Sequence, residues 1–241
     1  MDSLNLDYVK KRKIYRDVFE KASAAITQQL TELRKYYSCF DCASKCNSVS
    51  DDVLSKYPKH CKYRAWQEAC LYKLNNEISK DIYIKIKEIL DRRKDYSCNN
   101  CAVCCNFACS EFSHSELLLK AENGDNFAKQ FTAVFIPYEE KIEAMKIYPQ
   151  YVNLLSEQYQ NLNDVYFYHC PKLKNNLCSD YENRPVICRD FPDNPLAILP
   201  KSCGFYDWRE DVEISAMLMH ALSEIAGYYI DKISEALKSP D

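Results

Sequence analysis

The sequence predicts a mainly α-helical protein in which long amphipathic helices alternate with irregular, cysteine-rich loops. Two observations support this fold class. Apolar residues recur at helical spacing along several long stretches, whereas the alternating patterns of β-strands are scarce. The 14 cysteines among the 241 residues gather in clusters between those stretches. We therefore expect helices to form the scaffold and the loops to carry the cysteines.

Four stretches show the helical period. They cover residues 15–37, 63–93, 138–162 and 210–237, and the third is interrupted near Pro149. The last stretch is the clearest, because its apolar residues fall on one stripe: Ile214, Leu218, Ala221, Ile225, Tyr229, Ile233 and Leu237. Such stripes indicate surfaces that face a core rather than a binding groove.

The composition is that of a folded protein, with 47% hydrophobic and 28% charged residues. The net charge of −3 leaves no basic excess, so we expect no nucleic-acid partner. Only 3 glycines are present and they are scattered. Phosphate-binding loops and dinucleotide fingerprints need closely spaced glycines, so the sequence argues against nucleotide-dependent chemistry of those kinds.

The cysteines are expected to be thiols in a reducing compartment. The basic cluster near the N-terminus has no apolar stretch behind it, so we predict no signal peptide. No apolar run is long enough for a membrane span, so no membrane partner is expected either. We predict a cytoplasmic protein whose thiols bind metal. The alternative, a disulfide scaffold, fits poorly with the adjacent pair Cys104 and Cys105.

A segment of the chain is repeated at an offset of 59 residues. Residues 34–47 and 93–106 share an Arg-Lys pair, a Tyr-Ser pair, three cysteines, an alanine and an asparagine at matching positions. Each copy follows a long amphipathic stretch. We interpret the repeat as a duplicated metal-binding element, a helix whose C-terminal end delivers a cysteine hook. Chance convergence of two helix ends is the alternative.

The second copy contains the central cysteine cluster, Cys98, Cys101, Cys104 and Cys105. Three thiolates at three-residue spacing can converge on one metal centre, as in the first three cluster ligands of bacterial ferredoxins. The match is partial, because the next cysteine, Cys109, lacks the ferredoxin spacing and the proline after it. The first copy provides a second hook, with Cys61 or Cys70 as its further ligand: Cys39, Cys42 and Cys46.

Single cysteines follow the central cluster at long intervals: Cys170, Cys178, Cys188 and Cys203. Pro185 lies between the second and third of these, and it rules out a helical Cys-x9-Cys hairpin. Together with Pro192 it implies a rigid, bent segment that holds Cys188. Arg184 and Arg189 either offset the charge of a thiolate-rich centre or form structural ion pairs with the aspartates beside them.

These motifs together resemble the CxxCxxCC family of zinc- or iron-chelating proteins, also called the YkgJ-type cysteine-cluster family. The resemblance covers about residues 96–203. It rests on the central cysteine cluster and on a set of residues that follow it: Cys170, Leu173, Cys178, Tyr181, Arg184, Pro185, Cys188, Arg189, Phe191 and Pro192. One departure is Ala102, where the family tends to place glycine. A zinc knuckle often uses that glycine, so its absence counts slightly against zinc.

The resemblance implies metal binding by eight cysteines. We choose Cys203 as the eighth, with Cys109 as the rival. The resemblance implies no particular reaction, although proteins related to flagellin lysine N-methylases belong to the family. On this basis we divide the chain into residues 1–95, N-terminal helices with an extra hook in residues 39–70, and residues 96–241, a metal-chelating domain with a C-terminal helix.

The spacing favours an iron–sulfur cluster, most simply 4Fe-4S, over zinc. Both hooks are triplets with single cysteines downstream, whereas structural zinc commonly takes two separated pairs. Zinc remains the alternative because thiolate sites accept either metal. We expect Cys98, Cys101 and either Cys104 or Cys105 to bind with one or more of the four downstream cysteines.

Three functions remain open at this point. The metal centres transfer electrons or support a modification reaction, which brings in a protein partner or protein substrate. Alternatively, zinc staples a structural or interaction module without catalysis, or the protein stores and hands over metal. No nucleophile–base pair or phosphate loop stands out, so no catalytic residue is named and enzymatic activity is left open.

Overall fold

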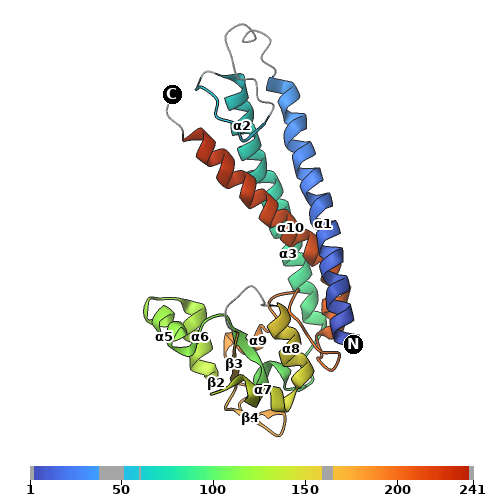
Figure 1. Cartoon of the computed structure of the whole chain (residues 1–241), viewed down its shortest axis with the longest axis vertical. Helices are drawn as coiled ribbons and strands as arrows, with labels where there is room; N and C mark the ends of the chain where they lie inside the picture. Colours follow the sequence, from blue (N-terminus) through green and yellow to red (C-terminus); the bar gives the residue numbers. More distant parts are fainter. Residues whose placement is uncertain (1–2, 38–51, 60, 159–164, 239–241) are drawn as a thin grey trace. The chain divides into compact units, whose positions relative to one another are not determined.

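The computed structural model describes residues 3–37, 52–59, 61–158 and 165–238. The chain forms two compact units. The cysteine unit comprises Met1–Tyr8 and Arg92–Glu213, and the helical unit comprises Val9–Asp91 and Ile214–Asp241. Helices dominate the described residues and the strands are short (Figure 1), which confirms the predicted mainly α fold.

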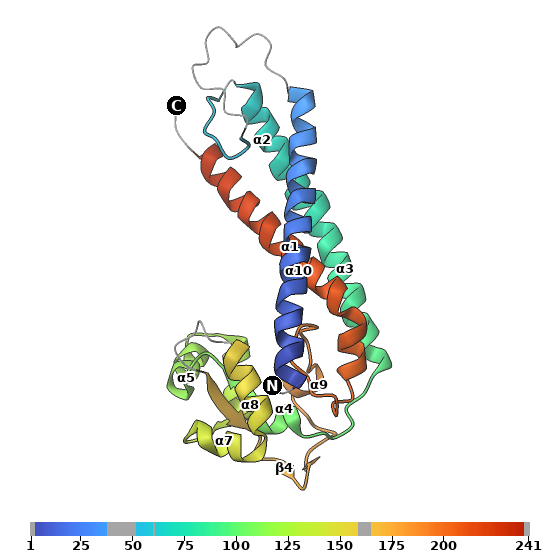
Figure 2. The ribbon, with the colours of Figure 1, turned by 45° about the vertical axis from the view of Figure 1, so that its right-hand side comes forward.

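Four helices make up most of the described part of the helical unit. They are α1 (Ser3–Leu33), α2 (Lys62–Lys73), α3 (Ser79–Asp91) and α10 (Tyr206–Leu237). A single π-helical turn, Leu74–Ile78, joins α2 directly to α3. Figures 1 and 2 show these helices running alongside one another. Three of the predicted amphipathic stretches are thus confirmed as helices.

The core of the helical unit is built largely from the predicted stripes, although Ile214 and Leu218 of the last stripe are exposed rather than core-facing. Trp66 is the largest side chain in it, 2% exposed, and its indole Nε1 donates a 2.8 Å hydrogen bond to the Leu30 carbonyl, so its polar atom is satisfied. The other buried members come from the four helices, the π-helical turn and the segment before α2: Ala22, Ile26, Leu30, Val53, Cys70, Leu74, Ile82, Ala221, Ile225, Ala226 and Ile233.

The two copies of the repeat begin at the same kind of helix end. α1 ends in a 3₁₀ turn, Arg34–Tyr37, and α3 ends in a 3₁₀ turn, Arg92–Asp95. In each turn an arginine guanidinium lies over an aromatic ring, 5.1 Å from the ring centroid for Arg34 and 4.7 Å for Arg93. This shared local conformation supports the duplication of a helix end.

The cysteine unit contains two small antiparallel sheets. The first has the order β1 (Ala108–Ser110), β3 (Tyr166–His169) and β2 (Ile136–Pro137). The second is a hairpin of β4 (Leu173–Lys174) and β5 (Leu177–Cys178). Strands of two to four residues are too short to show an alternation of apolar and polar residues, so the sequence pattern did not predict them.

The turn of the β4–β5 hairpin has a simple sequence cause. Asn175 and Asn176 both have positive φ, 49° and 61°. Two-residue hairpin loops favour this conformation because it matches the twist of the strands, and asparagine tolerates it better than most residues. The turn places Cys178 opposite Leu173.

The helices of the cysteine unit are shorter. The predicted stretch 138–162 forms α7 (Lys141–Ile147) and α8 (Pro149–Gln158), and the proline is the first residue of α8, where its missing N–H costs nothing. Of two further helices, the sequence indicates only the start of α5 (His114–Glu122), near Ser113 and His114, and does not indicate α6 (Asn126–Val134). Two one-turn helices complete the unit: α4 (Val103–Asn106) and α9 (Val186–Arg189).

Two hydrophobic clusters stabilise the cysteine unit. The α8 cluster consists of Val103, Phe107, Ala144, Tyr151, Val152, Leu155 and Phe167. The α5–α6 cluster consists of Leu117, Ala121, Ala128, Phe131, Phe135, Tyr168 and Cys170. Across the described residues of both units, none of the helices combines the length and apolar character needed to cross a membrane.

Candidate metal centre

Nine cysteines of the cysteine unit line one cavity of about 690 Å³. They are Cys98, Cys101, Cys104, Cys105, Cys109, Cys170, Cys178, Cys188 and Cys203. These include all eight cysteines predicted for the central site, brought together from segments up to about a hundred residues apart. Every cysteine in the described part of the chain is a free thiol, so none of these nine is in a disulfide.

The other predicted ligands lie elsewhere. Cys39, Cys42 and Cys46 fall outside the described residues. Cys61 precedes the first turn of α2 and is buried in the helical unit. Cys70 is fully buried there, its thiol 3.7 Å from the Leu30 carbonyl, and burial raises its pKa to about 12. Neither Cys61 nor Cys70 belongs to the cavity.

The central hook is shaped by two residues in the left-handed conformation. Asn100 has φ 61° and Ala102 has φ 62°, so the chain turns sharply after Cys98 and again after Cys101. Glycine adopts such φ values without strain, which gives a physical reason for a glycine preference at position 102. The second turn leads directly into α4, which presents Cys104 and Cys105.

A first group of thiols forms where the hook meets the segment around Cys203. The amide Nδ2 of Asn99 donates to the Ser202 carbonyl at 2.8 Å, and the Gly204 N–H donates to Asn99 Oδ1 at 3.0 Å. The two backbones touch here, because a Cβ on Gly204 would lie 2.1 Å from the Ser97 carbonyl oxygen.

The thiols of this first group interact. A hydrogen bond between the thiols of Cys203 and Cys101 lowers the pKa of Cys101 to about 6 and raises the pKa of Cys203. The pKa of Cys104 is raised mainly by its contact with Cys105 and by burial. The nearby thiols of Cys101 and Cys98 raise it further. We call Cys98, Cys101, Cys104 and Cys203 the first group.

A second group of thiols forms around the end of β3 and the β4–β5 hairpin. The Cys170 N–H donates to the Cys105 carbonyl at 2.6 Å, which fixes the end of α4 against the residue that follows β3. Cys178 ends the hairpin that begins just after Cys170. Cys188, on α9, has its pKa raised to about 11 by burial and by the neighbouring thiols of the other three.

The two groups meet at adjacent residues. The sulfur atoms of Cys104 and Cys105 are 4.0 Å apart. Their thiol–thiol contact raises the pKa of Cys104 and lowers that of Cys105. Cys109 lies on β1 opposite Phe167 and packs against the α8 cluster.

One arginine brings positive charge to the second group. The guanidinium of Arg184 lies 3.6 Å from the centroid of the Tyr181 ring, and its Nε donates to the Tyr181 carbonyl at 3.0 Å. This charge favours the thiolate forms of Cys105 and Cys188, although burial outweighs it at Cys188. The alternative partner considered for Arg184, Asp180, instead pairs with a lysine, Lys172.

Arg93 is a site residue that sequence reasoning did not single out. Its Nη2 donates to the carbonyls of Arg189 at 2.7 Å and Phe191 at 2.6 Å, and its guanidinium covers the Phe205 ring. One side chain thus joins the segments that follow Cys188 and Cys203. The sequence signal that could have pointed to Arg93 is that it matches Arg34 in the repeat.

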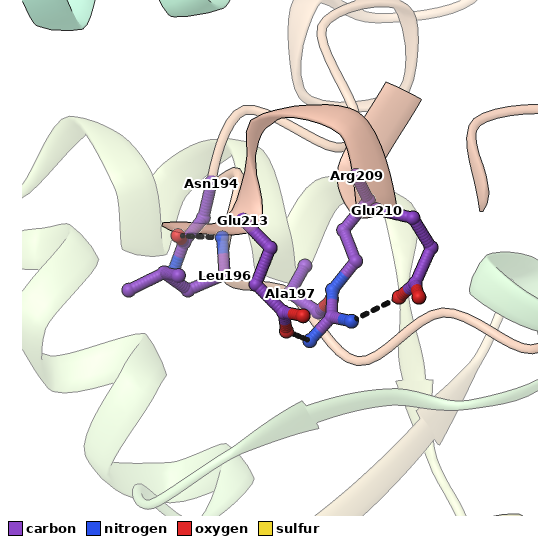
Figure 3. Close-up of polar contacts among 6 residues, drawn as sticks. All are labelled: Asn194, Leu196, Ala197, Arg209, Glu210 and Glu213. Atoms are coloured by element: carbon purple, nitrogen blue, oxygen red, sulfur yellow. Dashed lines mark hydrogen bonds and ion pairs between the residues drawn. The ribbon is translucent and has the colours of Figure 1, made fainter. Parts of the chain in front are cut away.

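A cluster of ion pairs around Arg209 fixes the loop that leads to Cys203 (Figure 3). Arg209, at the start of α10, pairs with Glu210 and Glu213 at 2.7 Å each and donates from Nε to the Ala197 carbonyl. Arg209 and Glu213 are 7% and 8% exposed, so this pair is shielded from solvent. It fixes the loop before Cys203 onto the first turns of the helix.

The donor set fits a thiolate-bound metal or cluster. Thiolates are soft ligands preferred by zinc and by iron–sulfur clusters, and the cavity offers them in two groups with apolar walls. Within the described residues, no three His, Cys, Asp or Glu side chains are gathered tightly around one point that would suit a single metal ion.

A family model with the description "CxxCxxCC: putative zinc- or iron-chelating domain" matches residues 97–212. The matched range includes all nine cysteines of the cavity. No curated protein and no solved structure matches the chain significantly.

Proposed function

Because the chain belongs, through residues 97–212, to the CxxCxxCC family of zinc- or iron-chelating domains, we propose that its cavity cysteines bind an iron–sulfur centre. The observation that supports this proposal is the convergence of nine thiols on a cavity of about 690 Å³. A 4Fe-4S cluster takes four thiolates and fills more space than a bare ion. Such a centre would supply one-electron transfer when bound.

The ligand pattern supports a cluster over zinc. Three thiols of the first group come from one hook at three-residue spacing, and the fourth, Cys203, comes from a distant segment. Iron–sulfur sites often combine a hook with a distant ligand in this way. The Tyr151 side chain, buried beside the cavity, helps to exclude water from this side of it.

The protein's own residues would tune the centre through charge and orientation. Arg184 places a guanidinium near the second group and offsets part of the negative charge of the thiolates. Arg93 ties together the backbone segments that follow Cys188 and Cys203, so that these two proposed ligands stay near the cavity. A role in electron transfer, or in support of a protein-modification reaction, follows as the functional proposal.

Anaerobic purification with analysis of iron, zinc and acid-labile sulfide tests this proposal. Iron and sulfide in similar amounts, with a visible absorption band that bleaches on reduction, are the expected result. Stoichiometric zinc in a colourless protein would overturn the cluster and favour a zinc-stapled module. A protein that takes up neither metal would overturn metal chelation by these cysteines.

A pair of variants assigns the metal to the cavity. Cys101→Ser removes a hook ligand and should reduce bound iron and sulfide. Cys70→Ser is the matched control, because Cys70 lies outside the cavity and a serine hydroxyl can donate to the same carbonyl. Equal metal loss in the two variants would contradict a site in the cavity.

A further inference from the structure

We propose that the eight motif cysteines form two separate four-thiol metal sites that share one cavity. Site A consists of Cys98, Cys101, Cys104 and Cys203, and Site B consists of Cys105, Cys170, Cys178 and Cys188. This inference rests on the proposed metal binding and goes beyond it, because neither the family description nor the cysteine spacing says how the ligands divide.

Site A is held together by direct contacts between its two segments. The hook and the Cys203 turn are joined by the two hydrogen bonds of Asn99, and their backbones come too close at Gly204 for any side chain. These contacts bring the distant Cys203 next to the hook.

Site B is held together by different elements. The 2.6 Å hydrogen bond from the Cys170 N–H to the Cys105 carbonyl places these two ligands on neighbouring backbones. The β4–β5 hairpin brings Cys178 back toward Cys170. Cys188 packs beside Cys105 and Cys170 against the α5–α6 cluster.

The packing separates the two sites. Cys101 lies against the α8 cluster, whereas Cys105, Cys170 and Cys188 lie against the α5–α6 cluster. The dividing point falls between Cys104 and Cys105 on α4. Consecutive residues of an α-helix point about 100° apart, so neighbours in sequence can serve different sites.

The two sites are tested by metal content and spectra of three variants, measured after anaerobic loading with iron and sulfide. Cys39, Cys42 and Cys46 are replaced by serine in the parent protein, so that the predicted second hook contributes no metal. Cys203→Ser should retain about half of the parent's metal, held by Site B, and Cys188→Ser about half, held by Site A. The double variant of Cys203 and Cys188 should retain none. Cys70→Ser is the control and should match the parent, because Cys70 lies in the core of the helical unit and outside the cavity.

A second double variant separates shared from distinct ligands. Replacing Cys98 and Cys203 together should cost no more metal than replacing either one, because both belong to Site A. The electron paramagnetic resonance signal left in Cys188→Ser should differ from that left in Cys203→Ser. Circular dichroism checks that each variant keeps its helices, and Cys98→Ser or Cys178→Ser replaces any that does not.

Each remaining outcome contradicts the two-site division. If either single variant loses all metal, the eight cysteines form one shared centre and the division is wrong, although chelation stands. Wild-type protein that holds a single equivalent also overturns it. Wild-type protein that holds no metal overturns the proposed function itself, so the two failures are distinguishable.

Discussion

At the scale of single residues, the geometry of the central hook depends on backbone conformations that few amino acids adopt. Ala102 has φ 62° and is buried, at the start of the turn that leads to Cys104 and Cys105. The left-handed region costs an L-residue about 1–2 kcal/mol. The CxxCxxCC family tends to have glycine at this position, and the left-handed backbone explains why glycine suits it.

Substitutions at position 102 test this explanation. Ala102→Val adds a β-branched side chain to a buried, left-handed position and should destabilise the cysteine unit by about 1–2 kcal/mol or more, a loss of roughly 2–8 °C in Tm. Ala102→Gly should stay within about 1 kcal/mol of the wild type, because relief of strain is offset by lost burial and a more flexible unfolded chain. Differential scanning calorimetry of both variants measures the difference. Equal Tm values would show that the turn is not strained.

Gly204 is the second residue at which the structure requires a particular amino acid, because there is no room for a side chain. A Cβ there would meet the Ser97 carbonyl oxygen at 2.1 Å, so Gly204→Ala should push the Cys203 turn away from the hook and lower the metal content of Site A. Gly227, in the middle of α10, provides the control, because a Cβ added there would meet no atom within 4 Å. Gly227→Ala should leave metal content unchanged and stabilise the helix by up to about 1 kcal/mol. Metal analysis of the two alanine variants measures this difference. Similar metal losses in both would show that the close contact between Gly204 and Ser97 does not position Cys203.

At the scale of the elements, the cysteine ligands come from turns and one-turn helices that are fixed by side chains outside the motif. Arg93 is the main example, since it binds two carbonyls of the segment after Cys188 and covers the ring of Phe205. Hydrogen bonds from a charged donor contribute about 1.5–3 kcal/mol. The helix end that carries Arg93 therefore positions ligands that lie about a hundred residues further along the chain.

Replacement of Arg93 should therefore affect metal binding without removing a ligand. Arg93→Ala should destabilise the cysteine unit by about 2 kcal/mol or more and weaken metal retention against a chelator. The neighbouring Arg92 is the matched control, because it is exposed and makes only a 3.8 Å ion pair with Asp211. Rates of metal loss to a competing chelator compare the two variants. If Arg92→Ala loses metal as fast as Arg93→Ala, the carbonyl contacts have no special role.

The sequence predicted the long elements well and the short ones poorly. Long amphipathic stretches average out local exceptions, which is why α2–α3 and α10 could be predicted from their stripes. Only the start of α5 was indicated, at Ser113, which forms a capping box with Glu116, and α6 was missed. Nine-residue helices offer only two turns of pattern, and the two-residue strands offer none.

The cysteines that line the cavity were predictable from the sequence, but their proposed division into two sites was not. Cysteine spacing singled out these thiols, because three cysteines at three-residue intervals are typical of a cluster-binding hook. Which distant cysteine joins which hook depends on tertiary contacts such as the hydrogen bonds of Asn99, and spacing contains no record of those. Arg93 and Arg209 were missed for the same reason.

At the scale of the whole molecule, the chain places its metal ligands and its largest helical core in different units. The core of the helical unit is closed by Trp66, Leu74, Ile233 and similar side chains, and its buried cysteine, Cys70, is not part of the cavity. In the cysteine unit, the proposed ligands lie on turns, a hairpin and one-turn helices, and most of them pack against two small hydrophobic clusters. Metal is therefore expected to contribute more to the stability of the cysteine unit than to that of the helical unit.

Removal of metal should affect the two units differently. Chelator-treated protein should show faster amide hydrogen exchange in residues 97–110 and 170–205, while α2 and the C-terminal half of α10 keep wild-type protection. Hydrogen-exchange mass spectrometry of loaded and chelated protein measures this. Uniform loss of protection along the chain would contradict the prediction, and so would no change at all.

The hydrogen bond between Cys101 and Cys203 has a consequence for handling the protein in air. A thiol with a pKa near 6 is mostly thiolate at neutral pH, and its hydrogen-bond partner is a second thiol within reach. Oxygen can therefore convert this pair into a disulfide once metal has left, whereas the adjacent Cys104 and Cys105 are poorly placed to bond to each other. Such oxidation would seal Site A against reloading until a reductant opens it. Aerobically purified samples would then contain less metal than the protein can hold, with the deficit concentrated in one of its two sites.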